Sequence, residues 1–256
     1  MTTYTAKWPN ENGLIEWTET ENNTWKTLIT RQYETVQHRA CDEYLAGLAE
    51  LHLSFDHIPQ LQDVNKILKK TAWEMVPVHG TVLITEFFTM LKNRQFPVAN
   101  FIRVPEELDY LQQPDVFHEL FGHGPLLLNP IYADFMQWYG NMALQFSGKK
   151  RKILSRLFWY TIEFGLLQTP HGLRIFGGGI LSSYAETLFS LESDQPQRLP
   201  FDITTVLKTD YDYQSIQPNY FILDNLAQLF ELQSSELLLQ LSDTDDNTAQ
   251  ETFINC

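Results

Sequence analysis

Two histidines in the segment PDVFHELFGHGPLL, His118 and His123, lie five residues apart and could share a metal ion. On an α-helix, residues i and i+5 point about 140° apart. The zinc-protease motif H-E-x-x-H instead places its histidines at i and i+4, on one helix face. One metal can therefore bind both imidazoles only if the chain leaves α-helical geometry near His123. Gly122 permits this, and Pro125 disfavours the α conformation at Gly124, so the sequence predicts such a departure.

Glu163 is the candidate for a third ligand. It is the one charged residue in FWYTIEFGLL, and an isolated carboxylate in an apolar helix needs a cation, a donor or a proton. Two histidines and one carboxylate hold non-haem Fe(II) and leave three positions open, but catalytic zinc accepts the same set. The residues thus predict a mononuclear site for iron or zinc. The structural alternatives are a hydrogen-bonded pair of core histidines and a buried Glu bonded to Tyr or Arg. The other histidines are expected in solvated or loop positions: His38, His52, His57, His79 and His171.

The elements that must position these side chains are predicted to be mostly helices. Asn129-Pro130 is a helix start signal, with Asn at the N-cap and Pro in the first turn, for a helix that ends near Leu144. Apolar spacing and flanking residues predict the remaining elements. The predicted helices are Trp25–Leu51, Pro59–Trp73, Thr85–Lys92, Ile153–Leu167 and Asn225–Leu241, and the predicted strands are Leu173–Phe176 and Tyr220–Leu223.

Composition limits the classes of protein to which the chain can belong. With 18 basic and 32 acidic residues its net charge is −14, which argues against a nucleic-acid or anionic-membrane partner. We expect a cytoplasmic protein, because there is no apolar run of membrane-spanning length and no signal-peptide pattern. Without a linker or repeat, residues 1–241 are expected to form a single catalytic domain, and the polar, acidic residues 242–256 a flexible tail.

Several long motifs, taken together and in order, resemble the pterin-dependent aromatic amino acid hydroxylases. They are PDVFHELFGHGPLL, FWYTIEFGLL and RIFGGGILSSYAET, and the likeness runs from about Pro77 to Glu186. WKTLITRQ and QFPVANFIRVPEELDYLQQPD are most similar to the short bacterial phenylalanine 4-hydroxylases. The resemblance implies a mainly α fold, a single helical catalytic domain with a few short strands. It also implies that His118, His123 and Glu163 are ligands of a non-haem Fe(II).

The same resemblance implies four substrate-binding residues. Arg103, in NFIRVP, matches the arginine that binds the substrate carboxylate, a task that suits a planar, permanently charged guanidinium. Trp159, four residues before Glu163, matches an aromatic residue near the substrate ring. Gly179 and Ser182, in GGGILSS, match a loop that closes on the amino acid's backbone end. Without the flanking match, GGG would be read as a flexible turn.

Four further residues are implied to bind the pterin. Phe87 corresponds to the ring that stacks on the cofactor, and Glu119 to the acid beside it. Gly80 and Val82 fall in the loop that contacts the pterin edge. Considered without the family, Phe87 is expected to be an ordinary core residue of an amphipathic helix.

The implied activity is that of a monooxygenase that converts L-phenylalanine to L-tyrosine. The implied co-substrates are O₂ and tetrahydrobiopterin or a related reduced pterin, and the implied context is phenylalanine catabolism and tyrosine formation. With no tetramerising helix evident, a monomer or small homo-oligomer is expected. Three alternatives stay open: a hydroxylase that prefers tyrosine or tryptophan, a zinc hydrolase with Glu119 as base, and a metal-free binding protein.

Overall fold

The architecture, given by a computed structural model, is described for residues 4–80, 82–109, 113–146, 148–213, 215–232 and 253–254. Helices account for most of these residues, so the prediction of a mainly α fold with a few short strands is confirmed. No helix in these ranges is both long and apolar enough to cross a membrane. The α-helices are α1 Glu19–Val36, α2 Asp42–Leu51, α3 Leu61–Leu68, α4 Ile84–Lys92, α5 Pro130–Ala143, α6 Gly148–Phe158, α7 Gly178–Leu181, α8 Tyr184–Glu192, α9 Ile203–Lys208 and α10 Gln228–Glu231.

Shorter helical segments and strands connect these helices. The 3₁₀-helices are η1 Lys69–Thr71, η2 Pro105–Glu107 and η4 Gly124–Leu128, and the π-helices are η3 His118–His123 and η5 Trp159–Glu163. The strands are β1 Glu74–Val78, β2 Val82–Leu83, β3 Gln95–Ala99, β4 Gly165–Thr169, β5 Gly172–Ile175, β6 Gln197–Pro200, β7 Asn219–Leu223 and β8 Phe253–Ile254.

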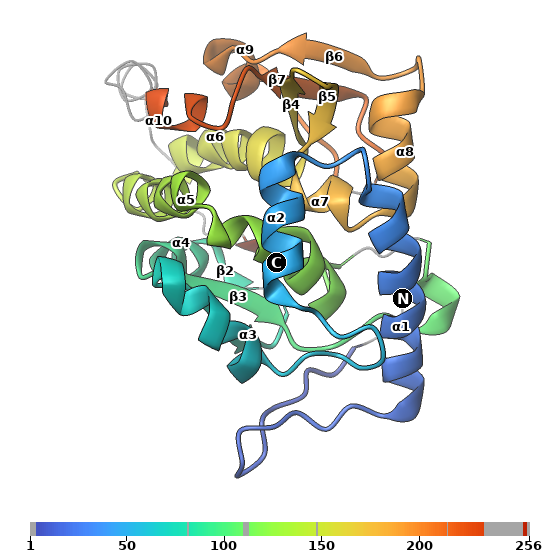
Figure 1. Ribbon diagram of the computed structural model, residues 1–256. Coiled ribbons are helices and arrows are strands. Elements are labelled where there is room, and N and C mark those ends of the chain that lie inside the picture. Colours follow the sequence, from blue (N-terminus) through green and yellow to red (C-terminus); the bar gives the residue numbers. More distant parts are fainter. Residues whose placement is uncertain are drawn as a thin grey trace.

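The strands form three small sheets among the described residues. Four strands pair in the order β5-β4-β7-β6, with β4 antiparallel to β5 and parallel to β7. β1 and β3 form a parallel pair, and β2 pairs antiparallel with β8. In Figure 1 the four-stranded sheet lies at the top and β3 just below the middle, with α2 and α5 between them in height. The two π-helices pack against different sheets, η3 against β3 and η5 against β4 and β7.

The Asn129-Pro130 start signal is confirmed. The Asn129 side chain accepts hydrogen bonds from the backbone N–H groups of Ile131 (3.0 Å) and Tyr132 (3.2 Å), and α5 begins at Pro130. α5 packs against α4, and Gly140 makes this close approach feasible. A Cβ at Gly140 would lie 2.6 Å from the backbone nitrogen of Lys92. The predicted helices Pro59–Trp73 and Thr85–Lys92 are also present, as α3 with η1 and as α4.

The predicted helix Trp25–Leu51 is wrong, because the chain breaks into α1 and α2. His38 adopts φ +64°, and the Cys41 N–H donates to the Ile175 carbonyl at 2.9 Å while Ala40 forms a bridge to the same residue. Pairing with the edge of β5 therefore replaces helical hydrogen bonds here. The spacing of apolar residues within one segment cannot indicate a pairing with a strand far along the chain.

The predicted helix Ile153–Leu167 is also wrong at its end. α6 ends at Phe158, η5 follows to Glu163, and Leu166 and Leu167 are buried in β4, opposite Ile222 and Leu223 of β7. The strands predicted at Leu173–Phe176 and Tyr220–Leu223 are present as β5 and β7. Of the predicted helix Asn225–Leu241, only residues up to 232 are described, and α10 lies there. Most of the predicted tail 242–256 lies outside the described residues, so its flexibility stays a prediction; the described Phe253–Ile254 pairs with β2.

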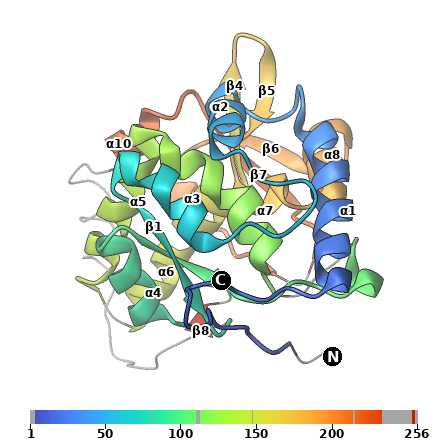
Figure 2. The same ribbon diagram turned by 60° about the horizontal axis from the view of Figure 1, so that its bottom comes forward.

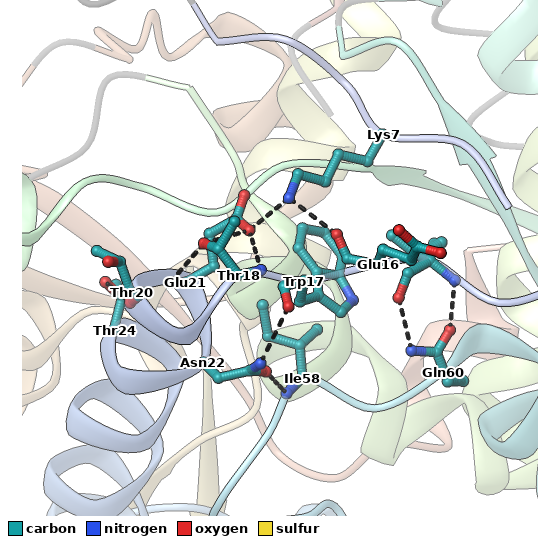
Figure 3. Close-up of polar contacts among 11 residues, drawn as sticks. Lys7, Glu16, Trp17, Thr18, Thr20, Glu21, Asn22, Thr24, Ile58 and Gln60 are labelled. Carbon is teal, nitrogen blue, oxygen red and sulfur yellow. Dashed lines mark hydrogen bonds and ion pairs between the residues drawn. The ribbon is translucent and has the colours of Figure 1, made fainter. Parts of the chain in front are cut away.

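The N-terminal segment is tied to α1 and to the loop before α3 (Figure 3). Lys7 donates to the Glu16 carbonyl and to the Glu21 carboxylate, which also accepts from the Thr18 N–H in a capping box. Gln60 exchanges two hydrogen bonds with the backbone of Ile15, at 2.8 and 3.0 Å. The segment thus runs along the side of the molecule that comes forward in Figure 2, where β8 also lies.

Candidate metal centre and substrate pocket

His118 and His123 lie at the two ends of the π-helix η3. Since a π-helix repeats its hydrogen bonds at i→i+5, residues five apart lie on one face. The two Nε2 atoms are accordingly 2.9 Å apart. The predicted departure from α geometry is confirmed, although it begins at His118. The expectation for Gly124 is wrong, because its φ of −50° and ψ of −47° are helical; a glycine has no Cβ to clash with the ring of Pro125.

Glu163, at the end of η5, completes a cluster of three ligand atoms. Its Oε1 lies 3.3 Å from His123 Nε2, and its Oε2 lies 3.8 Å from His118 Nε2. Ligands about 2.1 Å from a metal and at right angles lie about 3 Å from one another. The three side chains therefore fit one metal ion, as the sequence predicts, and all their ligand atoms fall within 4.8 Å.

The protonation of this cluster favours metal binding. Burial, and then the neighbouring His123, lower the pKa of His118 to about 4, so its imidazole is neutral at pH 7. Burial alone would raise the pKa of Glu163, but the two histidines and the Gly179 N–H hold it below its ordinary value. His118 Nδ1 lies 2.8 Å from Ser182 Oγ, which in turn donates to the Gly178 carbonyl at 2.9 Å. With its hydroxyl hydrogen engaged, Ser182 accepts from His118 Nδ1–H, and this leaves Nε2 free for a metal.

The GGG sequence is required by the site and is not a flexible turn. A Cβ at Gly178 would lie 2.4 Å from His123 Cε1, and one at Gly177 would lie 2.4 Å from the Glu163 carbonyl oxygen. A Cβ at Gly179 would be 3.0 Å from Glu163 Oε2. Real Cβ atoms do not approach this closely without displacement of a neighbour. The glycines therefore allow the backbone before and within α7 to pack directly on two of the three ligands.

Arg103 is held by a partner that sequence analysis missed, Asp115. Its Nε donates to Asp115 Oδ2 at 2.8 Å and its Nη2 to Oδ1 at 3.0 Å, and both residues are buried. Burial would raise the pKa of Asp115, but the Arg103 charge and hydrogen bonds hold it low. Asp115 also accepts from the His118 N–H at 3.0 Å. One carboxylate thus couples the candidate substrate arginine to the first turn of the metal-binding helix.

A cavity of about 550 Å³ joins these groups. His118 and Glu163 line it, and so do all four residues predicted to bind substrate: Arg103, Trp159, Gly179 and Ser182. The cavity also reaches Pro114 and Phe164. The hydrogen bonds observed for Ser182 are to His118 and to the Gly178 carbonyl, and the substrate roles of all four residues stay predictions.

The residues predicted to bind pterin are not among those that line this cavity. Phe87 is 2% exposed, with its ring against Phe158 and Phe88, as expected of a core residue. Gly80 adopts φ +136°, which favours glycine, and Val82 lies in β2. Glu119 is buried, and its Oε1 has no hydrogen-bond partner among the described residues. Burial, and then the nearby Glu163, raise the pKa of Glu119 well above its ordinary value, which favours the protonated form, a hydrogen-bond donor, more than in a free carboxyl. The cofactor roles of all four residues stay predictions.

Comparison with known proteins shows similarity to the aromatic amino acid hydroxylases. The sequence model of the biopterin-dependent aromatic amino acid hydroxylases matches residues 2–235. The phenylalanine-4-hydroxylase of Pseudomonas aeruginosa is 48% identical over 238 residues, which cover 93% of this chain and 90% of that protein. That of Vibrio cholerae is 45% identical over 239 residues, which cover 93% and 83%.

Solved structures agree in fold. The apo structure of the cold-active phenylalanine hydroxylase of Colwellia psychrerythraea superposes with a TM-score of 0.90 at 48% identity, covering 93% of this chain and 92% of that one. The Chromobacterium violaceum phenylalanine hydroxylase with bound iron(III) and 7,8-dihydrobiopterin gives a TM-score of 0.86 at 40% identity, covering 97% and 92%.

Proposed function

The chain belongs to the biopterin-dependent aromatic amino acid hydroxylases, and on that premise we propose that it is a phenylalanine 4-monooxygenase. It converts L-phenylalanine to L-tyrosine with O₂ and a tetrahydropterin as co-substrates, at a non-haem Fe(II). The observation that carries this proposal is the triangle of His118, His123 and Glu163, of which His118 and Glu163 line a cavity that Arg103 also lines. Each requirement of the reaction has a counterpart among these residues.

The donor set suits iron. Two neutral imidazoles and one carboxylate occupy one face of an ion and leave the other positions open. When bound, Fe(II) together with a reduced pterin supplies the activation of O₂ that lets one oxygen atom enter an aromatic ring. The iron-bound C. violaceum relative supports this assignment.

The protein's own contribution is to orient the substrate. We propose that Arg103 binds the carboxylate of phenylalanine, since a desolvated guanidinium in a cavity favours an anionic partner. Trp159 and Phe164, whose ring centroids are 4.6 Å apart, form one apolar wall next to the ligands, and we propose that the substrate ring lies against it. Fixing both ends of a small amino acid directs one ring carbon at the metal.

Pterin binding is proposed for Gly80, Val82, Phe87 and Glu119 together. The observation that supports it is the orphaned carboxyl of Glu119, one residue from a metal ligand. A protonated carboxyl there donates to an acceptor on the cofactor ring. The zinc-hydrolase alternative is disfavoured because the chain belongs to a family of hydroxylases.

A preference for phenylalanine follows from the cavity wall. Hydroxyl selectivity requires a polar partner for the phenol, and the indole N–H of Trp159 is already bonded to Gln217 at 3.0 Å. Where Trp159 and Phe164 form the wall, an added hydroxyl finds no free partner, and such a site rejects it by roughly 10²-fold at most. Tyrosine and tryptophan are therefore expected to be detectable but poorer substrates.

The proposal is tested by pterin-dependent product formation from phenylalanine, tyrosine and tryptophan at equal low concentrations. We expect the highest kcat/KM with phenylalanine. If another amino acid is best, the substrate is wrong although the family stands. We also propose a monomer or small homo-oligomer, which sedimentation velocity would check.

A further inference from the structure

Two residues from outside the recognised motifs hold the Trp159 side chain. Trp159 Nε1–H donates to Gln217 Oε1 at 3.0 Å. The Tyr211 ring stacks on the Trp159 ring, with centroids 4.3 Å apart and an interplanar angle of 14°. Both residues lie in the chain between α9 and β7, far in sequence from η5, and both line the cavity. The hydrogen bond therefore restrains the indole within its ring plane, and the stacked Tyr211 ring restrains it perpendicular to that plane.

The orientation of the Gln217 amide is fixed. Its Nε2 donates to the carbonyl oxygens of Asp212 (2.8 Å) and Ser215 (2.7 Å). Because carbonyl oxygens accept and cannot donate, the NH₂ group must face them and Oε1 must face Trp159. Gln217 is also 1% exposed, so water does not replace these bonds. The Gln217 side chain thus bonds the backbone of the loop to which it belongs, and its Oε1 accepts from the Trp159 indole.

The loop is in turn anchored to α8. The Gln217 N–H donates to Glu186 Oε1 at 3.1 Å, and the same oxygen accepts from the Tyr220 hydroxyl. Tyr211 is anchored separately, since its hydroxyl lies 3.2 Å from Ser155 Oγ on α6. The two restraints on Trp159 therefore rest on different helices, and a displacement of either helix does not by itself free the indole.

We infer that Gln217 and Tyr211 are positioning residues that fix the Trp159 indole and so set the selectivity of the cavity for a single six-membered ring. This inference rests on the proposed function. A fixed indole keeps the phenylalanine ring in register with the metal site. It also disfavours the larger ring of tryptophan. A loosened indole loses both properties, so part of the pterin oxidation proceeds without hydroxylation.

The test is a double-mutant cycle on the iron-loaded enzyme with Gln217→Met, Trp159→Phe and the double variant. Two quantities are measured: the ratio of kcat/KM for phenylalanine to that for tryptophan, and the amount of tyrosine formed per pterin oxidised. Methionine keeps the length of glutamine and removes its amide. Gln32→Met is the matched control, because Gln32 is a buried glutamine that bonds Leu181 and Thr187, with no bond to Trp159.

Loss of one hydrogen bond corresponds to about a 2- to 10-fold change. Gln217→Met is expected to lower the selectivity ratio by that factor and to lower the yield of tyrosine per pterin. In the Trp159→Phe background the same change should have less than about a 2-fold effect, because the N–H it serves is gone. Gln32→Met should lower the unfolding temperature without moving either quantity.

Unchanged selectivity and yield in a folded Gln217→Met would overturn the inference, as would an equal effect in the Trp159→Phe background. If Gln217→Met does not fold, Tyr211→Leu decides by the same two readouts, since it removes the stacking partner from a partly exposed position. A parent enzyme that forms no tyrosine would instead contradict the proposed function.

Discussion

Asp115 accepts three hydrogen bonds from Arg103, one from the backbone N–H (3.0 Å) and two from the guanidinium (2.8 and 3.0 Å). The Nε edge of the guanidinium is thereby occupied inside the protein. A substrate carboxylate must bind the remaining N–H groups of Arg103. The arginine is thus pre-oriented by a buried carboxylate, and the cost of immobilising its side chain is met on folding and not on binding.

Arg103→Lys should lower kcat/KM for phenylalanine roughly 10- to 100-fold. The variant keeps the charge but cannot bind Asp115 and a substrate carboxylate in two planar pairs, and a charge-assisted hydrogen bond is worth about 1.5–3 kcal/mol. Arg39→Lys, at a surface pair with Glu192, is the control and should retain activity. Phenethylamine, which lacks the carboxylate, should be a very poor substrate of the parent; equal turnover of both compounds would exclude this role.

Ser182→Ala should weaken iron binding about 10- to 100-fold, because it removes the partner that orients His118. Ser190→Ala is a matched control, since Ser190 is also buried but bonds the Thr187 carbonyl. Iron affinity is measured by competition with a chelator, and KM for phenylalanine separately. An unchanged iron affinity with a raised KM would assign Ser182 to the substrate instead.

Glu21→Gln should destabilise the protein by about 0.5–1 kcal/mol at pH 7, the usual size of a helix-cap effect at a partly exposed position. Burial would raise the Glu21 pKa, but its bonds with Lys7 and Thr18 lower it. A carboxyl with a lowered folded-state pKa stabilises above its unfolded pKa and loses that effect as the pH falls through the folded value. The difference from the parent in urea denaturation should therefore shrink below about pH 4.

Glu19→Gln is the control for this pH dependence. Glu19 also lies in the first turn of α1, so the variant loses the same charge near the helix N-terminus but no capping box. A Glu21→Gln penalty that is equal to that of Glu19→Gln, or constant from pH 7 to pH 3.5, would show that the bonds to Lys7 and Thr18 contribute nothing.

Local signals in the sequence predicted local structure well. Asn129 and Pro130 set the start of α5, because the Asn129 side chain accepts from the next two N–H groups, so four consecutive residues contain the whole cause. The break at His38 was missed because its cause, pairing with Ile175, lies far along the chain. The end of α6 was missed for the same reason, since Leu166 and Leu167 are helix-compatible residues that pair with β7.

The site residues also differ in whether the sequence alone could identify them. His118, His123 and Glu163 are recognisable because metal ligation demands those residue types, and the π-helical winding follows once both histidines must face one ion. Asp115 had a usable signal, an Asp three residues before His118 that caps its N–H. Gln217 and Tyr211 had none, because an uncharged side chain in a loop acquires its role only from the tertiary contact.

The most direct measurement of the central claim is metal-dependent tyrosine formation by the chelator-stripped enzyme supplied with phenylalanine, O₂ and a tetrahydropterin. Fe(II) should restore the activity and zinc should not. Glu163→Ala and His118→Ala should stay inactive and bind no iron tightly, whereas His171→Ala, an exposed histidine, should behave like the parent. Activity restored by zinc and not by iron, or iron retained without Glu163, would contradict the account.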